Sequence, residues 1–166
     1  MNNSELSQQV VVALGERTLA TAESLTGGLI GAMITAVPGS SKVYRGGVIT
    51  YATDLKSSML DIPSATMSHG VVSKEVASAM AVGVAYFLNA EFAISTTGVA
   101  GPEPQEGHPP GTVYISVFQR GRDGAPKSVT EKLTLVAQSA DEWQGREEIR
   151  QATVQAALNL LLTFLV

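Results

Sequence analysis

The order of strand-like and helix-like segments constrains the fold of this chain more than any other feature. Short alternating or β-branched segments are separated by segments whose apolar residues recur at helical spacing. The strand-like segments are residues 18–23, 43–51, 91–97, 112–120 and 128–136, and the helix-like segments are residues 4–16, 29–36, 53–60, 73–88 and 141–166. Strands that alternate with helices are typical of a parallel sheet, whereas the hairpin of the last two strands requires an antiparallel member. We therefore predict an α/β fold, a three-layer α/β/α sandwich with a mixed, mostly parallel sheet of about five strands, in one domain over residues 1–166.

Charge and residue usage exclude several classes of protein. The chain has 11 Lys and Arg against 15 Asp and Glu, and its net charge of −4 argues against a nucleic-acid partner. No cysteine is present, which excludes disulfides and thiolate ligands and is typical of a reducing compartment, the cytoplasm. No histidine pair or acidic run has the spacing of a metal site. We therefore expect neither a metal nor a cofactor.

The chain offers no segment suited to a membrane or to export. Its first residues are polar and include an acid, unlike a signal peptide. The apolar segment at residues 156–166 is too short to span a bilayer. We expect it to form a packed helix, with a contact between subunits as the alternative, and we expect no membrane partner.

Two glycine-containing segments follow predicted strands, at residues 23–28 and 97–102. In α/β sheets, ligands bind beyond the carboxyl ends of the strands, and glycines there let backbone N–H groups approach a ligand closely. Such segments suit a phosphate or a developing oxyanion, although neither has the dinucleotide or Walker spacing. Simple turn geometry is the alternative for each segment alone.

Ser24 is a candidate nucleophile, because it stands between a strand end and the glycine pair Gly27 and Gly28 before a predicted helix. An N-cap serine for that helix is the alternative. A nucleophilic serine requires a base, and the only two histidines, His69 and His108, fall in predicted loops. Side chains in loops usually face solvent, so a Ser-His-Asp triad is poorly supported.

Lys56 is a better candidate for the base. If Thr53 caps the helix at residues 53–60, Lys56 falls in its first turn, where the helix dipole opposes an ammonium group. Burial would lower the pKa of Lys56 further and give a neutral amine that accepts a proton. An exposed helix lysine is the alternative. Tyr51 could relay a proton or position a substrate ring, with core packing as its alternative.

Arginines supply the candidate anion ligands. Arg146 and Arg150 lie four residues apart and so share one face of the last helix. They suit a clamp for a phosphate or a carboxylate, with ion pairing to Glu142 or Glu147 as the alternative. Arg45, before the second glycine pair, has the same ambiguity. That pair, residues 46–47, predicts a bend or bulge in its strand.

Seven segments together resemble the CinA C-terminal domain family, in the order in which that family carries them. They are residues 20–28 (ATAESLTGG), 37–41 (VPGSS), 44–51 (YRGGVITY), Lys56, 69–73 (HGVVS), 97–102 (TGVAGP) and 111–113 (GTV). The resemblance extends over residues 6–162, nearly the whole chain. Stand-alone members of this family include nicotinamide-nucleotide amidase.

The resemblance implies hydrolysis of the carboxamide of nicotinamide mononucleotide (NMN) to nicotinate mononucleotide and ammonia. It assigns the nucleophile to Ser24 and the base to Lys56, with Tyr51 beside them. NMN is the expected small-molecule substrate, and we expect the protein to form a homo-oligomer. We expect the oxyanion on backbone N–H groups at the first glycine pair and the nucleotide on the second glycine segment and Arg146. The expected substrate-binding residues are Thr26, Gly27, Gly28, Arg45, Thr97, Gly98, Gly101 and Arg146.

Three positions depart from the family pattern. Leu25 follows the serine where the family usually has cysteine, so that cysteine is not the nucleophile here. Residues 103–108 lack the usual glycine pair, and His108 stands where lysine, which carries more charge, is common. Residues 144–146 read Gln-Gly-Arg where Gly-Asp-Arg is expected. The altered loop favours an alternative function, a catalytically silent nucleotide-binding or competence-related interaction module. The retention of Ser24, Tyr51 and Lys56 together favours the enzyme.

Overall fold

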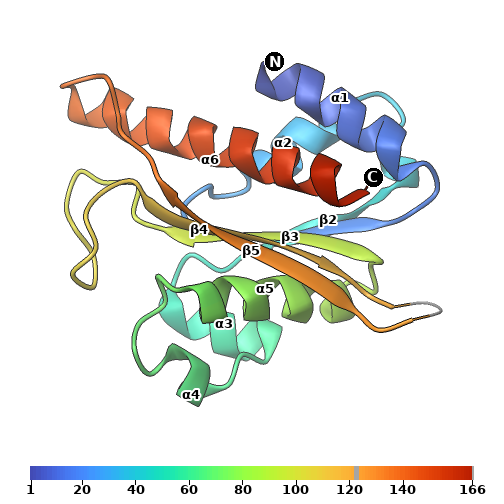
Figure 1. The fold of residues 1–166 in the computed structure, drawn as a ribbon, viewed down its shortest axis with the longest axis horizontal. Coiled ribbons are helices and arrows are strands. Elements are labelled where there is room, and N and C mark those ends of the chain that lie inside the picture. Colours follow the sequence, from blue (N-terminus) through green and yellow to red (C-terminus); the bar gives the residue numbers. More distant parts are fainter. Residues whose placement is uncertain (122–123, 166) are drawn as a thin grey trace.

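The computed structural model describes residues 1–121 and 124–165 (Figure 1). Its elements, in chain order, are α1 (Asn3–Leu14), β1 (Leu19–Glu23), α2 (Leu29–Thr35), the 3-10 helix η1 (Ser40–Lys42), β2 (Tyr44–Ile49), α3 (Thr53–Leu60), α4 (Ser64–Met67), α5 (Lys74–Phe87), β3 (Phe92–Gly98), β4 (Thr112–Gln119), β5 (Lys127–Thr134) and α6 (Glu142–Leu165). Each segment predicted as a helix or a strand forms that element, whereas η1 and α4 were not predicted. Part of the turn predicted at residues 121–124, and residue 166, lie outside the described residues.

The five strands form one mixed sheet in the order β2-β1-β3-β4-β5. β1 pairs in parallel with both β2 and β3, while β4 is antiparallel to both β3 and β5. Four strands therefore run in one direction and only β4 opposes them, which confirms the predicted sheet. The pairing of β1 with β2 skips Arg45, so the predicted irregularity lies one residue before the glycine pair.

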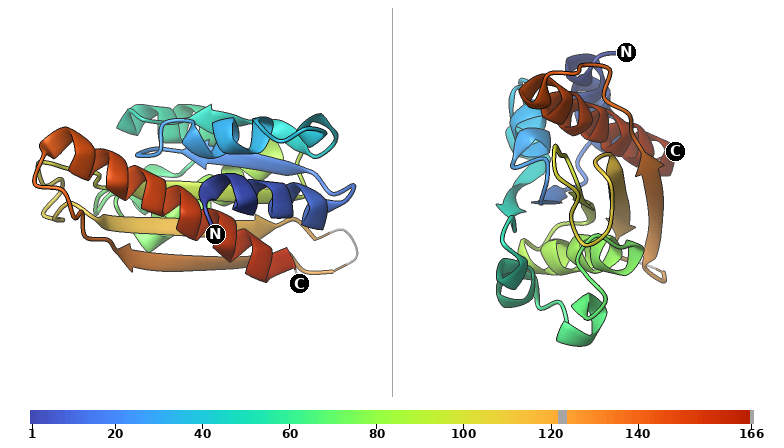
Figure 2. Two further views of the ribbon diagram at one scale, coloured as in Figure 1. Left: turned by 90° about the horizontal axis from the view of Figure 1, so that it is seen from above. Right: turned by 90° about the vertical axis from the view of Figure 1, so that its left-hand side faces the viewer.

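Helices cover both faces of the sheet, as predicted for a three-layer sandwich (Figures 1 and 2). The core beneath α1, α2 and α6 holds large side chains such as Leu6, Phe92 and Leu158, each of which contributes about 1.5–3 kcal/mol when buried. On the other face, small residues of β1 and α5, including Ala20 and Ala85, let α5 pack closely on the sheet. Alternating strand side chains thus fill two separate cores.

The last helix, α6, runs across the face that it shares with α1 (Figure 2). Its C-terminal half buries Ala157, Leu158 and Leu161, which confirms the packed helix predicted there. No helix in the described part of the chain is both long and apolar enough to cross a membrane. The N-terminal half of α6 instead carries Arg146 and Arg150 toward the carboxyl end of β1.

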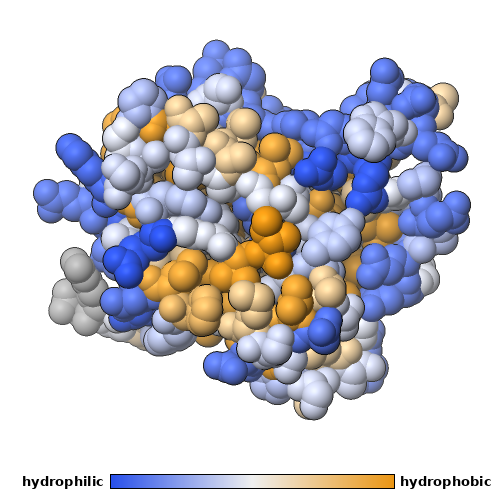
Figure 3. Space-filling model, turned by 180° about the vertical axis from the view of Figure 1, so that it is seen from behind, coloured by the Kyte–Doolittle hydropathy of each residue, from blue (hydrophilic) through white to orange (hydrophobic). Residues whose placement is uncertain are grey.

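Apolar surface also gathers on the side opposite to the view of Figure 1 (Figure 3). A groove of about 550 Å³ lies between α3 and α5. Its lining residues include Met59, Ile62, Val82 and Phe87. Phe87 is 57% exposed. The groove is separate from the residues predicted to form the functional site.

Helix α3 begins differently from the prediction. Its N-cap is Ala52, whose side chain makes no capping hydrogen bond, and Thr53 is already helical. The predicted cap at Thr53 is therefore wrong, although Lys56 does fall in the first turn. Because β1, β2 and β3 are parallel, their carboxyl ends meet at one end of the sheet, where the segments after them converge.

Candidate active site

Ser24 is the first residue after β1, in the β1–α2 turn (residues 24–28). Its backbone N–H donates to the carbonyl of Thr96 on β3 at 3.1 Å, and its carbonyl accepts from the N–H of Gly27 at 3.0 Å. The N-cap of α2 is Gly28, at φ 96°, with no side-chain cap. Ser24 is thus not the N-cap, and its half-buried side chain lines a cavity at the end of the sheet.

Lys56 reaches the same cavity from α3 and is only 1% exposed. Its Nζ donates to the carbonyl of Thr50 at 2.7 Å and lies 3.3 Å from Oγ of Ser24. Burial lowers the pKa of Lys56, and the negative charge of Glu106 opposes that shift. The structure therefore excludes an exposed helix lysine and brings an amine with a lowered pKa next to a serine hydroxyl.

The cavity beside this pair has a volume of about 310 Å³. Its opposite wall is the β3–β4 loop (residues 99–111) together with Thr97 and Gly98 at the end of β3. A Cβ on Gly98 would approach the carbonyl of Thr112 to 2.6 Å, so the close pairing of β3 with β4 requires glycine there. A cavity of this size suits a small molecule of about the size of a nucleoside.

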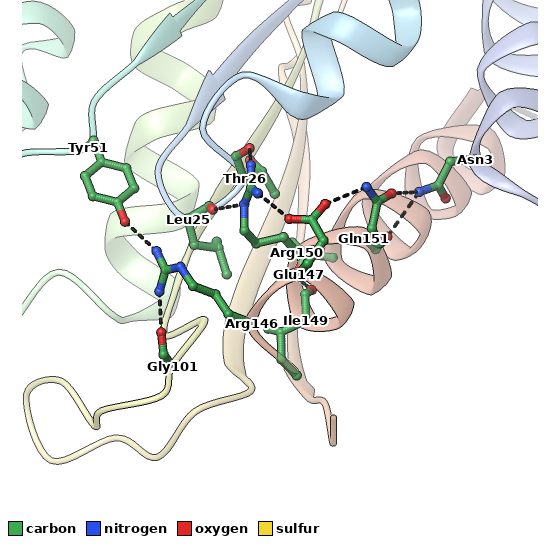
Figure 4. Close-up of polar contacts among 11 residues, drawn as sticks. Asn3, Leu25, Thr26, Tyr51, Gly101, Arg146, Glu147, Ile149, Arg150 and Gln151 are labelled. Carbon is green, nitrogen blue, oxygen red and sulfur yellow. Dashed lines mark hydrogen bonds and ion pairs between the residues drawn. The ribbon is translucent and has the colours of Figure 1, made fainter. Parts of the chain in front are cut away.

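Arg146 joins the two sides of the cavity entrance (Figure 4). Its guanidinium donates to the hydroxyl of Tyr51, after β2, at 2.7 Å and to the carbonyl of Gly101 in the β3–β4 loop. Tyr51 is 57% exposed, so the structure excludes core packing for its ring. Tyr51 and Arg146 thus place polar donors at the edge of the cavity.

Most of the predicted site residues meet at this cavity. Its lining includes Ser24, Tyr51, Lys56, Thr97, Gly98, Gly101 and Arg146. The hydroxyl of Thr97 donates to the carbonyl of Val71 at 2.8 Å, so its present partner is the backbone before α5.

Four predicted residues do not line this cavity. Thr26, Gly27 and Gly28 are not among its lining residues, and the N–H groups of both glycines bond within the chain, to Ser24 and Glu23. Arg45 lies near the amino end of β2, where its Nε donates to the carbonyl of Leu88 at 2.9 Å. The β-bulge at Arg45 is thus far from the carboxyl ends of the strands.

Three charged residues near the cavity have contacts that the sequence did not predict. Glu23 and Glu106 were not candidates, and Arg150 was a candidate anion ligand. Glu23 accepts hydrogen bonds from the β1–α2 turn, and Arg150 donates to the carbonyls of Leu25 and Thr26. Arg150 also pairs with Glu147, which the sequence analysis gave as its alternative. Glu106 accepts from the N–H groups of residues 71 and 72, which line the cavity, at 2.8 and 3.1 Å. A carboxylate directly before the candidate nucleophile is the one signal that could have identified Glu23.

The two histidines do not line the cavity. His69 is exposed beside Ser68, and His108 pairs with Gln105 through the backbone within the β3–β4 loop. Among residues 1–121 and 124–165, no three His, Asp or Glu side chains converge as metal ligands would. The titratable group placed to act on Ser24 is Lys56.

Comparison with known proteins gives one consistent family. The CinA C-terminal domain model matches residues 3–165. A putative competence-damage inducible protein of Limosilactobacillus reuteri is 43% identical over 159 residues, 94% of this chain and 36% of that protein. A CinA-like protein of Frankia casuarinae is 43% identical over 87% of this chain and 31% of that protein. This chain therefore spans about a third of the length of these relatives.

Solved structures agree in fold. A CinA superfamily protein from Klebsiella pneumoniae superposes with a TM-score of 0.87 at 30% identity, over 99% of this chain and 98% of that one. A competence/damage inducible protein from Agrobacterium tumefaciens superposes with a TM-score of 0.85 at 34% identity, over 97% and 94% of the two chains. The likeness thus extends over the whole sandwich.

Proposed function

From the premise that this chain belongs to the CinA C-terminal domain family, we propose that it is an amidohydrolase that converts NMN to nicotinate mononucleotide and ammonia. The observation that carries the proposal is the contact between Nζ of Lys56 and Oγ of Ser24, 3.3 Å apart in a cavity that admits a small molecule. A serine beside a desolvated amine is a nucleophile with its base. The substrate itself follows from the family resemblance.

In the proposed acylation step, Oγ of Ser24 attacks the carbonyl carbon of the carboxamide while the neutral amine of Lys56 accepts the hydroxyl proton. The tetrahedral intermediate then collapses, the C–N bond breaks, and Lys56 returns the proton to the departing ammonia. The product of this step is an ester between Oγ of Ser24 and the carboxyl group of nicotinate mononucleotide. Water then attacks the ester while Lys56 accepts its proton. The C–O bond to Ser24 breaks as Lys56 returns that proton to Oγ, which releases nicotinate mononucleotide and restores the hydroxyl and the neutral amine.

The oxyanion requires donors next to Ser24. The backbone N–H of Leu25 belongs to the residue after the nucleophile, a usual position for an oxyanion donor, and Leu25 lines the cavity. Among the described residues it has no hydrogen-bond acceptor, whereas the N–H groups of Gly27 and Gly28 do. We therefore assign the oxyanion to Leu25 in place of the glycine pair.

The rest of the nucleotide would lie toward the β3–β4 loop. Arg146 and the hydroxyl of Tyr51 are the donors at the cavity entrance that suit an anionic group such as phosphate. Binding there would exchange the bond between Arg146 and Tyr51 for bonds to the substrate. The N–H groups at the start of α2 are unsuited to this role, because Glu23 already occupies them.

The direct test is ammonia release from NMN by the purified protein, with Ser24→Ala as the control for contaminating activity. We expect nicotinate mononucleotide and ammonia in equal amounts, and loss of both in the variant. The second candidate function is a catalytically silent nucleotide-binding module, which the altered residues 103–108 favour. NMN binding without ammonia release would establish that alternative and refute the enzyme.

A further inference from the structure

The β1–α2 turn is held from two sides by charged side chains that do not line the cavity. Glu23 contacts it from the end of β1, and Arg150 contacts it from α6. Neither side chain can reach a substrate in the cavity, so the catalytic steps above give them no role. Their contacts are nevertheless concentrated on the residues around the proposed nucleophile.

Glu23 is a buried carboxylate, 1% exposed, whose partners are all in the segment that follows it. Its Oε2 accepts from the hydroxyl of Thr26 at 2.7 Å and from the N–H groups of Gly28 and Ile30 at 3.0 and 3.1 Å. Its Oε1 accepts from the N–H of Gly31 at 2.9 Å. Within the described residues no cation pairs with this carboxylate. It is stable here because four donors replace water, and the turn is thereby fixed to α2.

Arg150 holds the opposite side of the turn (Figure 4). Its Nε donates to the carbonyl of Leu25 at 3.1 Å, and a terminal nitrogen donates to the carbonyl of Thr26 at 3.0 Å. Glu147, one helical turn earlier, pairs with the same guanidinium and orients it. The planar fork of arginine thus fixes two consecutive peptide groups through two different nitrogens, a rigid geometry that the single nitrogen of a lysine does not offer.

The contacts of Arg150, together with the hydrogen bond from Gly27 to Ser24, determine where the N–H groups beside Ser24 point. In a trans peptide the N–H points opposite to the carbonyl of the preceding residue. Because Arg150 holds the carbonyl of Leu25, the N–H of Thr26 points away from α6. Because the N–H of Gly27 holds the carbonyl of Ser24, the N–H of Leu25 is fixed in the same way. The turn is therefore set in one conformation before any substrate enters.

We propose that Glu23 and Arg150 are positioning residues that clamp the β1–α2 turn so that the hydroxyl of Ser24 and the N–H of Leu25 face the substrate together. The inference rests on the proposed role of Ser24 as the nucleophile. Glu23 secures the N–H groups of the turn and of α2, and Arg150 secures the carbonyls. A displacement of about 1 Å in such a constellation costs up to about 100-fold in rate.

The test compares Arg150→Met with a matched control variant far from the cavity. Methionine keeps the apolar part of the arginine side chain and removes the guanidinium. Arg17 is the control, because its guanidinium also bridges two backbone carbonyls, those of Ala13 and Leu14, but far from the cavity. We expect Arg150→Met to lower kcat about 10- to 100-fold with KM within about threefold, and Arg17→Met to change kcat less than about twofold. Melting temperatures of both variants establish that folded protein is compared at the assay temperature.

A second measurement tests the clamp without assuming that NMN is the substrate. The rate at which a small fluorophosphonate labels Ser24, followed by intact mass, reports hydroxyl reactivity without NMN. We expect this rate to fall in Arg150→Met and in Glu23→Gln, but not in Arg17→Met. If the wild type is labelled without hydrolysing NMN, the proposed substrate is wrong and slower labelling of the two clamp variants still supports the clamp. If the labelling rate and kcat of Arg150→Met equal those of Arg17→Met, the proposed clamp is wrong. If the wild type is neither labelled nor active, both the clamp and the role of Ser24 as the nucleophile are wrong.

Discussion

The two walls of the cavity are built in opposite ways. The β1–α2 turn is short, and its position is fixed by the buried carboxylate of Glu23, by Arg150 and by the backbone of β3. The β3–β4 loop is longer, and the side chains of residues 102–107 are exposed. Backbone bonds between Val99, Gly111 and Thr112 hold only its base.

Toward its tip, the β3–β4 loop is anchored to a distant segment by the carboxylate of Glu106, which accepts from the N–H groups of Val71 and Val72. Its backbone is also unusual, since Glu106 has φ 53° and Gly101 has φ 90°. A wall made of exposed side chains can vary without disturbing a core. A wall made of buried hydrogen bonds cannot, because each broken bond leaves an unsatisfied polar group.

The difference suggests a division of roles between the walls. The β1–α2 turn and the adjacent Lys56 would carry the chemistry, which requires fixed geometry. The β3–β4 loop, with Arg146 across the entrance, would select the substrate and adjust the electrostatic environment of the base. Substitutions on the first side should then change kcat, and substitutions on the second should change KM or the pH dependence.

The largest effect is expected from Lys56→Met, which removes the amine and keeps the volume of the side chain. Without a base for Ser24, we expect kcat to fall about 10³-fold, measured as ammonia release from NMN. Lys56→Arg should lose as much activity, because its guanidinium stays protonated near neutral pH. Circular dichroism and the melting temperature check that each variant is folded. Substantial activity in Lys56→Arg would refute the assignment of the base.

A smaller effect, on KM and not on kcat, is expected from Arg146→Met. Loss of the guanidinium at the entrance removes the cation placed to bind an anionic group, so we expect KM for NMN to rise about tenfold with kcat within about threefold. Tyr51→Phe is the matched variant, because it removes only the hydroxyl that Arg146 contacts at 2.7 Å. Its KM should change about two- to threefold. A loss confined to kcat in Arg146→Met would contradict the division between the walls.

The sequence was sufficient where local signals repeat or where the residues match the family. Helical and strand periodicity located each predicted element, and the late hairpin required the antiparallel strand β4. The pairing of Ser24 with Lys56, 32 residues apart, was predicted from the resemblance and from the helix position of the lysine. Both residues follow neighbouring parallel strands, so sheet topology alone brings them to one end of the fold.

Sequence reasoning failed where a side chain binds the backbone of a distant segment. Arg150 bonds to the carbonyls of Leu25 and Thr26, which lie more than 120 residues earlier in the sequence. These partners become evident only when α6 is packed on the sheet. Glu106 likewise binds the backbone of residues 71 and 72, more than 30 residues earlier in the sequence. Arg45 was a candidate anion ligand like the arginines of the last helix, but it lies near the amino end of its strand, and its Nε donates to the carbonyl of Leu88. No spacing rule distinguishes these cases, because backbone groups are present at every position.

The smallest and most specific effect is expected from Glu106→Gln. If Lys56 is the base, it must be neutral to act, so kcat/KM should rise with pH through its pKa. Burial lowers the pKa of Lys56, and the charge of Glu106 raises it. The amide keeps an oxygen for the N–H groups of Val71 and Val72 but removes the negative charge. The pKa of Lys56 should therefore fall further, and the acid limb of the kcat/KM profile should move to lower pH.

Glu103→Gln is the matched control for Glu106→Gln. Glu103 is exposed on the same loop and lines the cavity, but it is not among the causes of the lowered pKa of Lys56. We expect its acid limb to stay in place, while loss of a nearby carboxylate changes KM for the anionic substrate only slightly. Equal displacement in both variants would mean that the loop acts through its total charge. An unmoved limb in Glu106→Gln would mean that the β3–β4 loop does not influence the base, and the loop would then serve in substrate binding alone.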